Sequence, residues 1–178
     1  MKGNSVSYVL RLGLTLLAIT VVVAGLLGAV NYITQDKIAA LTQEKTDAAM
    51  AQVLPADQYN AIPIPDGQTL VTGLWSAGEA GYVAECVVSG SQGDIDLMVG
   101  VTPEGRVSGV SIISMSETSG LGDNAKKEDW RAQFVGKGQV SVDKDGGEIE
   151  ALTGATITSR AVCKAVSAAV ACVEEVQP

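Results

Sequence analysis

The segment TLVTGLWSAGEAGYVAECVVSGSQGDIDLMVGVTPEGRVSGVSIISM (residues 69–115) determines the predicted fold. It contains four runs rich in β-branched and other apolar residues, at 69–75, 82–88, 94–101 and 106–115. The short intervening segments, among them SGSQG and PEG, contain glycine, which is typical of tight turns between neighbouring strands. We therefore predict that these runs form an antiparallel meander.

Helices are predicted on either side of these strands. Apolar residues at near-helical spacing indicate a helix over 34–54, which Pro55 ends, and another helix is expected at about 125–135. A final helix at about 155–175 carries an apolar stripe suited to core packing. The predicted fold class is α+β: one N-terminal transmembrane helix followed by a single domain with a twisted, mainly antiparallel sheet packed by helices.

The apolar content is concentrated near the N-terminus. No charged residue occurs from Leu12 to Ile33, and a helix of that length spans roughly 33 Å, enough to cross a bilayer core. Tyr8 and Tyr32 stand at its two ends, where amphipathic rings favour the headgroup level. Lys2 and Arg11 precede the segment without any acid, whereas acids follow it, so the positive-inside rule predicts a cytoplasmic N-terminus.

This pattern divides the chain into four parts. We expect residues 1–11 in the cytoplasm and residues 12–33 as a single span through the lipid of the cytoplasmic membrane. Residues 34–66 would form a juxtamembrane helix and linker, and residues 67–178 an extracytoplasmic domain. A cleaved signal peptide is the alternative, but its apolar core is usually about 7–15 residues long, and no lipobox-like Leu-x-x-Cys follows the run here.

Composition excludes several kinds of chemistry. The net charge is −8 and the chain has no histidine. An acidic chain without a basic cluster is not expected to bind nucleic acid, and the missing imidazoles remove histidine catalysis and histidine metal sites. The three cysteines, Cys86, Cys163 and Cys172, lack metal-ligand spacing. We expect buried free thiols, while a disulfide between Cys86 and one of the others stays open. Chemistry must therefore come from carboxylates, hydroxyls, thiols or a bound cofactor.

The segment EALTGATITSRAV (150–162) changes from a turn to an amphipathic helix within TGAT. Ala155 and Thr156 would lie in the first turn, where helix amides lack internal acceptors and favour a phosphate. Gly154 allows close backbone approach. The alternative is that the threonine simply caps the helix.

Residues 150–156, E-A-L-T-G-A-T, resemble the D-x-x-(S/T)-G-A-T signal that a flavin transferase reads in extracytoplasmic flavoproteins. The resemblance implies that flavin mononucleotide (FMN) is joined by a phosphoester bond to the hydroxyl of Thr156. Thr153, Gly154 and Ala155 would then surround the phosphate. Glu150 stands where the family has Asp, and because the charge is kept we expect the transferase still to recognise it.

Residues 116–122, S-E-T-S-G-L-G, are similar to the SETPGLG loop of the G subunit of the Rnf complex, a membrane-bound ferredoxin:NAD oxidoreductase that translocates ions. Ser119 replaces the usual Pro. We expect this loop to cover the isoalloxazine ring, with Leu121 as the apolar contact and Glu117 or Thr118 supplying polar groups.

The resemblance covers the whole chain and implies an electron-relay subunit that does not catalyse alone. Electrons from reduced ferredoxin or NADH would reach the flavin on the outer side and return through membrane subunits, coupled to Na⁺ or H⁺ movement. The implied partners are the membrane and iron–sulfur subunits of the Rnf complex, and the flavin transferase. The alternatives are the C subunit of the Na⁺-translocating NADH:quinone reductase, a membrane-anchored adaptor without cofactor, and an anchored flavoprotein that serves an extracellular acceptor.

Two further patterns have ordinary explanations. Gly120-x-Gly122-x-x-Ala125 formally matches a dinucleotide fingerprint, but too little chain follows it for the parallel sheet of a Rossmann fold. Trp130 and Phe134 are four residues apart on one predicted helix face, which also fits the Rnf family and favours core packing.

Overall fold

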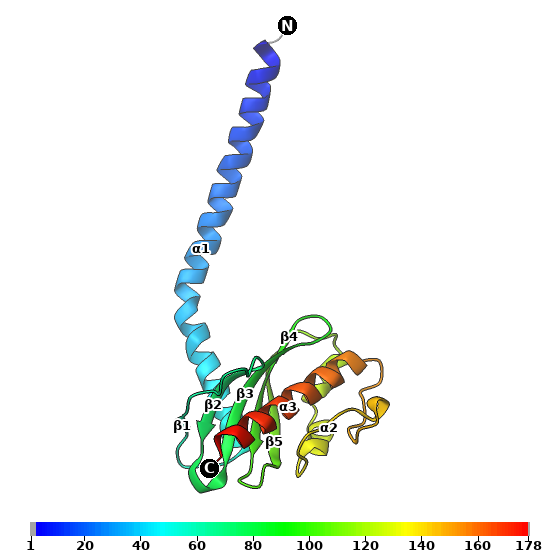
Figure 1. The fold of residues 1–178 in the computed structure, drawn as a ribbon. Helices are drawn as coiled ribbons and strands as arrows, with labels where there is room; N and C mark the ends of the chain where they lie inside the picture. Colours follow the sequence, from blue (N-terminus) through cyan, green and yellow to red (C-terminus); the bar gives the residue numbers. More distant parts are fainter. Residues whose placement is uncertain (1–2, 178) are drawn as a thin grey trace. The chain divides into compact units, whose positions relative to one another are not determined.

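The computed structural model describes residues 3–177, and the chain divides into two compact units, Met1–Glu44 and Lys45–Pro178. Helix α1 runs without interruption from Gly3 to Val53 (Figure 1). Its large apolar side chains between Tyr8 and Ile33 are exposed. The helix is also long and apolar enough to cross a membrane, which agrees with the expected span.

The second unit contains the antiparallel sheet that the sequence predicts. Its five strands lie in the order β1-β2-β3-β4-β5. Their bounds are Asn60–Ala61 (β1), Val71–Ser76 (β2), Tyr82–Ser89 (β3), Asp94–Val101 (β4) and Val107–Met115 (β5). Each of the four predicted runs forms a strand, and all pairings are antiparallel. Strand β1 was not predicted. It has only two residues, both exposed, which is too short for an alternation of apolar and polar side chains.

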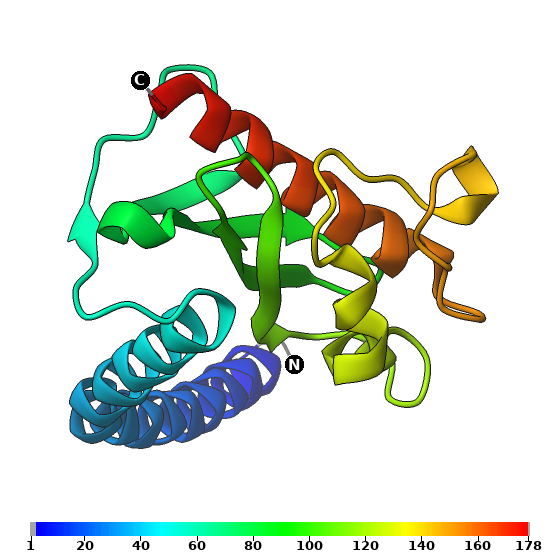
Figure 2. The same cartoon turned by 90° about the horizontal axis from the view of Figure 1, so that it is seen from below.

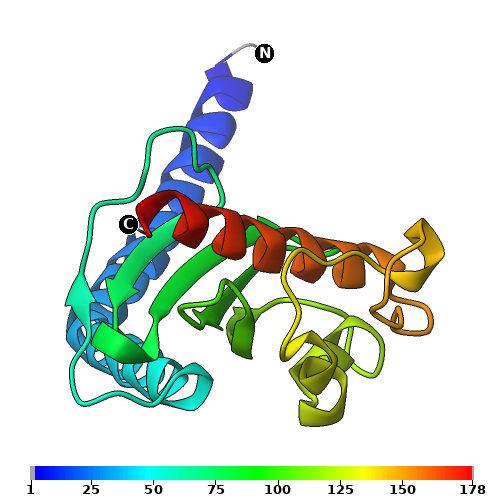
Figure 3. The ribbon, with the colours of Figure 1, turned by 60° about the horizontal axis from the view of Figure 1, so that its bottom comes forward.

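Helix α3 (Thr156–Val176) covers one face of the sheet (Figures 2 and 3). The predicted apolar stripe is buried, at Val162, Ala165, Val166, Ala169, Val170 and Val173. Fully burying one valine side chain contributes about 1.5–3 kcal/mol, so this face holds the helix on the sheet. Although α3 is long and apolar enough for a membrane span, 61% of its most apolar stretch is buried inside the protein. It is therefore a core helix, and the α+β prediction is confirmed.

The opposite face of the sheet receives the C-terminal end of α1. Met50 and Val53 are buried there with Val83 and Met98 of the sheet. Successive side chains of a strand point to opposite faces of the sheet. Accordingly, the neighbours Ala84, Leu97 and Val99 belong to the core under α3. The Ser108 hydroxyl donates a hydrogen bond of 2.7 Å to the carbonyl oxygen of Val53. The end of α1 is thus part of the compact unit.

The prediction of a single helix at about 125–135 is wrong. The structure has three short pieces: 3₁₀ turns at Gly122–Lys126 (η2) and Ala132–Phe134 (η3), and the one-turn helix α2 (Glu128–Arg131). Lys127 interrupts the helix with extended backbone angles, φ −68° and ψ 135°. The predicted core packing of Trp130 and Phe134 is confirmed, with ring centroids 5.2 Å apart in an edge-to-face arrangement.

All three cysteines are buried and free, as expected. The Cys86 thiol lies 3.6 Å from the carbonyl oxygen of Ala165 on α3. Burial raises the pKa of the Cys86 thiol, and likewise that of Cys163, to about 12. These side chains therefore act as small apolar groups in the core and are not nucleophiles.

Candidate functional site

The TGAT segment forms a tight turn that leads into α3. The amide of Ala155 donates to the carbonyl oxygen of Leu152 at 3.0 Å, and Gly154 adopts φ +76°. A Cβ at Gly154 would also lie 3.0 Å from Cδ2 of Leu121. The Ser159 hydroxyl closes the turn from inside, because it accepts from the Leu152 amide and donates to the Ala155 carbonyl oxygen, both at 3.0 Å. The positive φ favours glycine at position 154, and a methyl group there would also displace the Leu121 side chain.

No side chain caps the start of α3. The helix begins at Thr156, and its N-cap is Ala155, which has no side-chain oxygen to offer. Interpreting Thr156 as a plain helix cap is therefore wrong. The first amides of an α-helix have no intrahelical acceptor and carry partial positive charge, so this end of α3 suits an anion.

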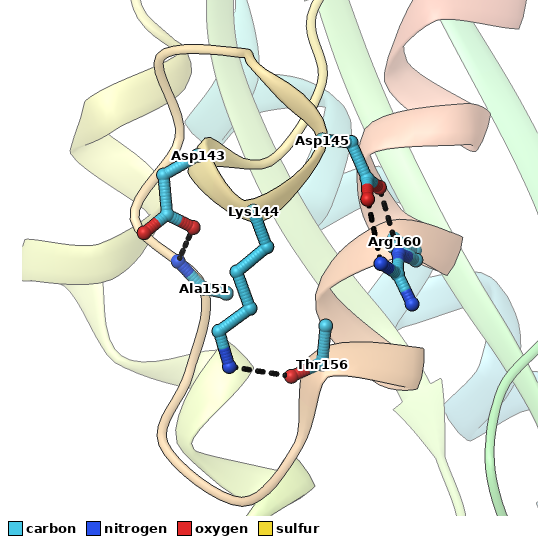
Figure 4. A network of polar contacts seen from close by, with 6 residues as sticks. All are labelled: Asp143, Lys144, Asp145, Ala151, Thr156 and Arg160. Carbon is cyan, nitrogen blue, oxygen red and sulfur yellow. Dashed lines mark hydrogen bonds and ion pairs between the residues drawn. The ribbon is translucent and has the colours of Figure 1, made fainter.

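A lysine lies against the Thr156 hydroxyl. Lys144 belongs to the 3₁₀ turn η4 (Asp143–Asp145), and its Nζ is 2.9 Å from Oγ1 of Thr156 (Figure 4). Sequence reasoning missed this residue. Its only signal was its place in an acidic turn shortly before TGAT, and turn residues have no periodicity that fixes where their side chains point.

The predicted loop at 116–122 is attached to the start of α3 through Glu117. One carboxylate oxygen of Glu117 accepts from the Ser91 amide at 2.6 Å, and the other accepts from the Thr158 hydroxyl at 2.9 Å. A Cβ at Gly122 would lie 2.9 Å from the Thr158 hydroxyl oxygen, so glycine makes room for this bond. Both oxygens of Glu117 are thus used by the protein itself.

Thr156 lines a hollow of about 320 Å³ between this loop and α3, which we call the threonine hollow. Six of the seven predicted site residues line it together, at Glu117, Thr118, Leu121, Gly154, Ala155 and Thr156. The seventh, Thr153, lines a neighbouring hollow of about 600 Å³ that also contains Leu121, Trp130 and Glu150. Lys144 and Ile157 complete one side of the threonine hollow.

Two exposed apolar side chains flank the Thr156 hydroxyl. Leu121 is 42% exposed and Ile157 is 60% exposed, and both line the threonine hollow. The site therefore combines a cation and uncapped helix amides with apolar surface. Ile157 was not predicted, because one isoleucine outside the core stripe of a helix is usually unremarkable.

Glu150 presents its carboxylate to solvent while its backbone is held in place. Its amide donates to Oε1 of Gln133 and its carbonyl oxygen accepts from the Trp130 indole, each at 2.8 Å. The side chain itself is exposed. An enzyme that reads this acidic position would find it accessible on a fixed backbone.

The site lies within a recognised family region. Residues 90–171 match the FMN-binding domain, and residues 1–53 match the RnfG N-terminal region. The G subunit of the proton-translocating ferredoxin:NAD⁺ oxidoreductase complex of Clostridium ljungdahlii is 38% identical over 166 residues, covering 86% of this chain and 86% of that relative. This chain belongs to the family of Rnf G subunits. The resemblance to the Rnf G subunit is thereby confirmed.

Other Rnf G subunits are similar over the same extent. The G subunit of the Na⁺-translocating ferredoxin:NAD⁺ oxidoreductase complex of Acetobacterium woodii is 32% identical, over 89% of this chain and 88% of the relative. The crystal structure of Shewanella oneidensis NqrC aligns with 65% of this chain and 65% of that chain, with a TM-score of 0.46 and 19% identity. The RnfG match at residues 1–53 favours the Rnf assignment over the quinone reductase alternative.

The residues present fit an FMN molecule. A phosphate needs N–H donors and positive charge, which the uncapped end of α3 and Lys144 supply. A flat aromatic ring needs apolar contacts, and Leu121 and Ile157 offer these in the same hollow as Thr156. The match to the FMN-binding domain spans all of these residues.

Proposed function

We propose that this Rnf G subunit carries FMN esterified through its phosphate to Thr156. It would serve as an electron-transfer subunit of an ion-translocating ferredoxin:NAD oxidoreductase. The observation that carries the proposal is the Thr156 hydroxyl itself. It stands at the uncapped start of α3, within reach of Lys144, in a chain that matches the FMN-binding domain.

The surrounding residues have separate roles in this proposal. Gly154 and the first amides of α3 hold the phosphate, with Thr153 and Ala155 shaping the turn. Leu121 contacts the ring from the loop at 116–122. Glu117 holds that loop against α3, since both its oxygens are bonded to the protein, and Thr118 lines the hollow next to it.

The flavin would supply the redox chemistry, and the protein would set its position and electrostatic surroundings. A covalent bond to Thr156 has a physical advantage outside the cytoplasm, where a dissociated cofactor is lost by dilution. Thr153, Gly154 and Ile157 are exposed, so a flavin bound here would remain accessible for electron transfer to a partner subunit.

The proposed orientation places residues 1–11 in the cytoplasm, residues 12–33 in the cytoplasmic membrane as a single span, and residues 34–66 next to it. The FMN-binding domain, 67–178, then lies outside. Support comes from the apolar α1 and from the charge bias around it. The compact unit begins at Lys45, so the last turns of α1 fold with the domain.

The partners proposed are the membrane and iron–sulfur subunits of the Rnf complex and the flavin transferase that installs FMN. Relatives are named for complexes that translocate protons in Clostridium ljungdahlii and Na⁺ in Acetobacterium woodii. Family membership therefore implies ion translocation without selecting the ion.

Replacing the attachment oxygen tests the proposal. Thr156→Val keeps the shape of the side chain but removes the hydroxyl, so in-gel flavin fluorescence after denaturation should disappear while the domain stays folded. Thr72→Val, at an exposed threonine on β2 outside the threonine hollow, should keep full fluorescence. A fluorescent Thr156→Val band would refute the attachment site.

A further inference from the structure

The turn η4 is fixed at both of its ends. Oδ1 of Asp143 accepts a hydrogen bond of 3.0 Å from the Ala151 amide, and Asp145 pairs with Arg160 of α3 through two bonds of 2.7 and 2.5 Å (Figure 4). Lys144 lies between these two attachments. Its ammonium group therefore projects from a turn that is tied both to Ala151, two residues before TGAT, and to α3.

This arrangement gives the threonine hollow a positive charge, which stands beside the carboxylate of Glu117 in the same lining. Among the described residues that line the hollow, Lys144 is the sole basic one. The nearby Arg160 is engaged with Asp145. A lysine usually keeps its ammonium in open water, because holding it in one place costs side-chain entropy. Lys144 is itself exposed, yet its Nζ lies 2.9 Å from the oxygen that would carry the phosphoryl group.

We propose that Lys144 is a positioning residue for the phosphoryl group on Thr156, held in place by Asp143 and Asp145. The inference rests on the proposed attachment of FMN to Thr156. A phosphate esterified on both sides carries one negative charge, and the Lys144 ammonium neutralises that charge. The turn η4 thus acts as one wall of the phosphate site, opposite the amides of α3.

The first test compares lysine reactivity in the full-length protein. Acetylation requires the unprotonated amine, and an ammonium paired with a phosphate is protected from it. In flavin-loaded protein, Lys144 should be acetylated several-fold more slowly, relative to Lys164, than in the Thr156→Val variant. Lys164 is an exposed lysine on α3, outside the threonine hollow, and serves as the internal control. An unchanged ratio of Lys144 to Lys164 overturns the inference.

The second test measures flavin loading by intact mass when the transferase is limiting. Lys144→Met should reduce the loaded fraction several-fold without changing the melting temperature. Lys144→Arg should restore most of it, and Lys164→Met should equal the wild type. Wild-type loading in Lys144→Met overturns the inference but leaves the attachment to Thr156 standing. Loading of Thr156→Val would instead refute the proposed function.

Discussion

The carboxylate of Glu117 accepts a hydrogen bond of 2.9 Å from the hydroxyl of Thr158, which is fully buried. This contact joins the S-E-T-S-G-L-G loop to the first turn of the helix that begins at Thr156. The two motifs that are distant in sequence therefore form one site.

Glu117→Ala should loosen the loop and destabilise the domain. It leaves the buried Thr158 hydroxyl without its acceptor, and an unsatisfied buried group of this kind costs about 1–3 kcal/mol. The Ser91 amide also loses its acceptor, but Ser91 is exposed and its amide can bond to water instead. Urea denaturation should show this loss, and hydrogen exchange should increase in the loop at 116–122. Glu79→Ala, at an exposed glutamate, is the control; equal stability of the two variants would show that the contact is unimportant.

Gly154→Ala should reduce both stability and flavin loading. A non-glycine residue at φ +76° costs about 1–2 kcal/mol, and the new methyl group would press on Leu121. Gly67→Ala separates the two effects, because Gly67 has φ +93° but open space around it. Denaturation and intact mass should show a larger stability loss for Gly154→Ala, with a loading defect confined to it. A loading defect of the same size in Gly67→Ala would argue against a specific role of this turn.

Asp96→Asn should stabilise the domain at neutral pH. Burial raises the pKa of Asp96, and burial together with the Asp96 charge raises the pKa of Glu85. One oxygen of Asp96 is buried without a hydrogen-bond partner. The pKa of Asp96 is higher in the folded than in the unfolded state, so ionisation of Asp96 lowers the free energy of unfolding. This loss of stability is absent below the ordinary carboxyl pKa of about 4 and grows as the pH rises through the raised pKa.

Asp96→Asn should therefore raise the free energy of unfolding by up to about 1 kcal/mol at pH 7. The gain is no larger because the charge of a half-exposed group is partly screened by solvent. Melting temperatures of wild type and variant should converge in acid. Asp57→Asn, at an exposed aspartate, should change little at either pH. A constant difference between wild type and Asp96→Asn across the pH range would contradict this explanation.

Glu150→Ala should lower the yield of flavin-loaded protein without unfolding the domain. The Glu150 side chain is exposed, and its backbone is held by Trp130 and Gln133, so the substitution removes only the surface charge. Glu150→Asp, which restores the acid of the family signal, should load at least as well as the wild type. Intact mass gives the loaded fraction, and full loading of the alanine variant would show that the acidic position is irrelevant.

The sequence predicted those parts of the fold that periodicity specifies. The strands β2 to β5 and the stripe of α3 follow directly from apolar alternation and spacing. The helix expected at about 125–135 was wrong because Lys127 takes extended backbone angles that local propensity does not encode. Within the site, the motifs predicted Thr156 and the loop, whereas Lys144 and Ile157 come from positions whose direction only the folded chain determines.

The most direct measurement is intact mass followed by peptide mapping of protein purified from its native membrane. We expect one species heavier by one FMN less one water, with the whole increment on the peptide that contains Thr156. Protein of unmodified mass, or an increment located on a peptide that lacks Thr156, would contradict it.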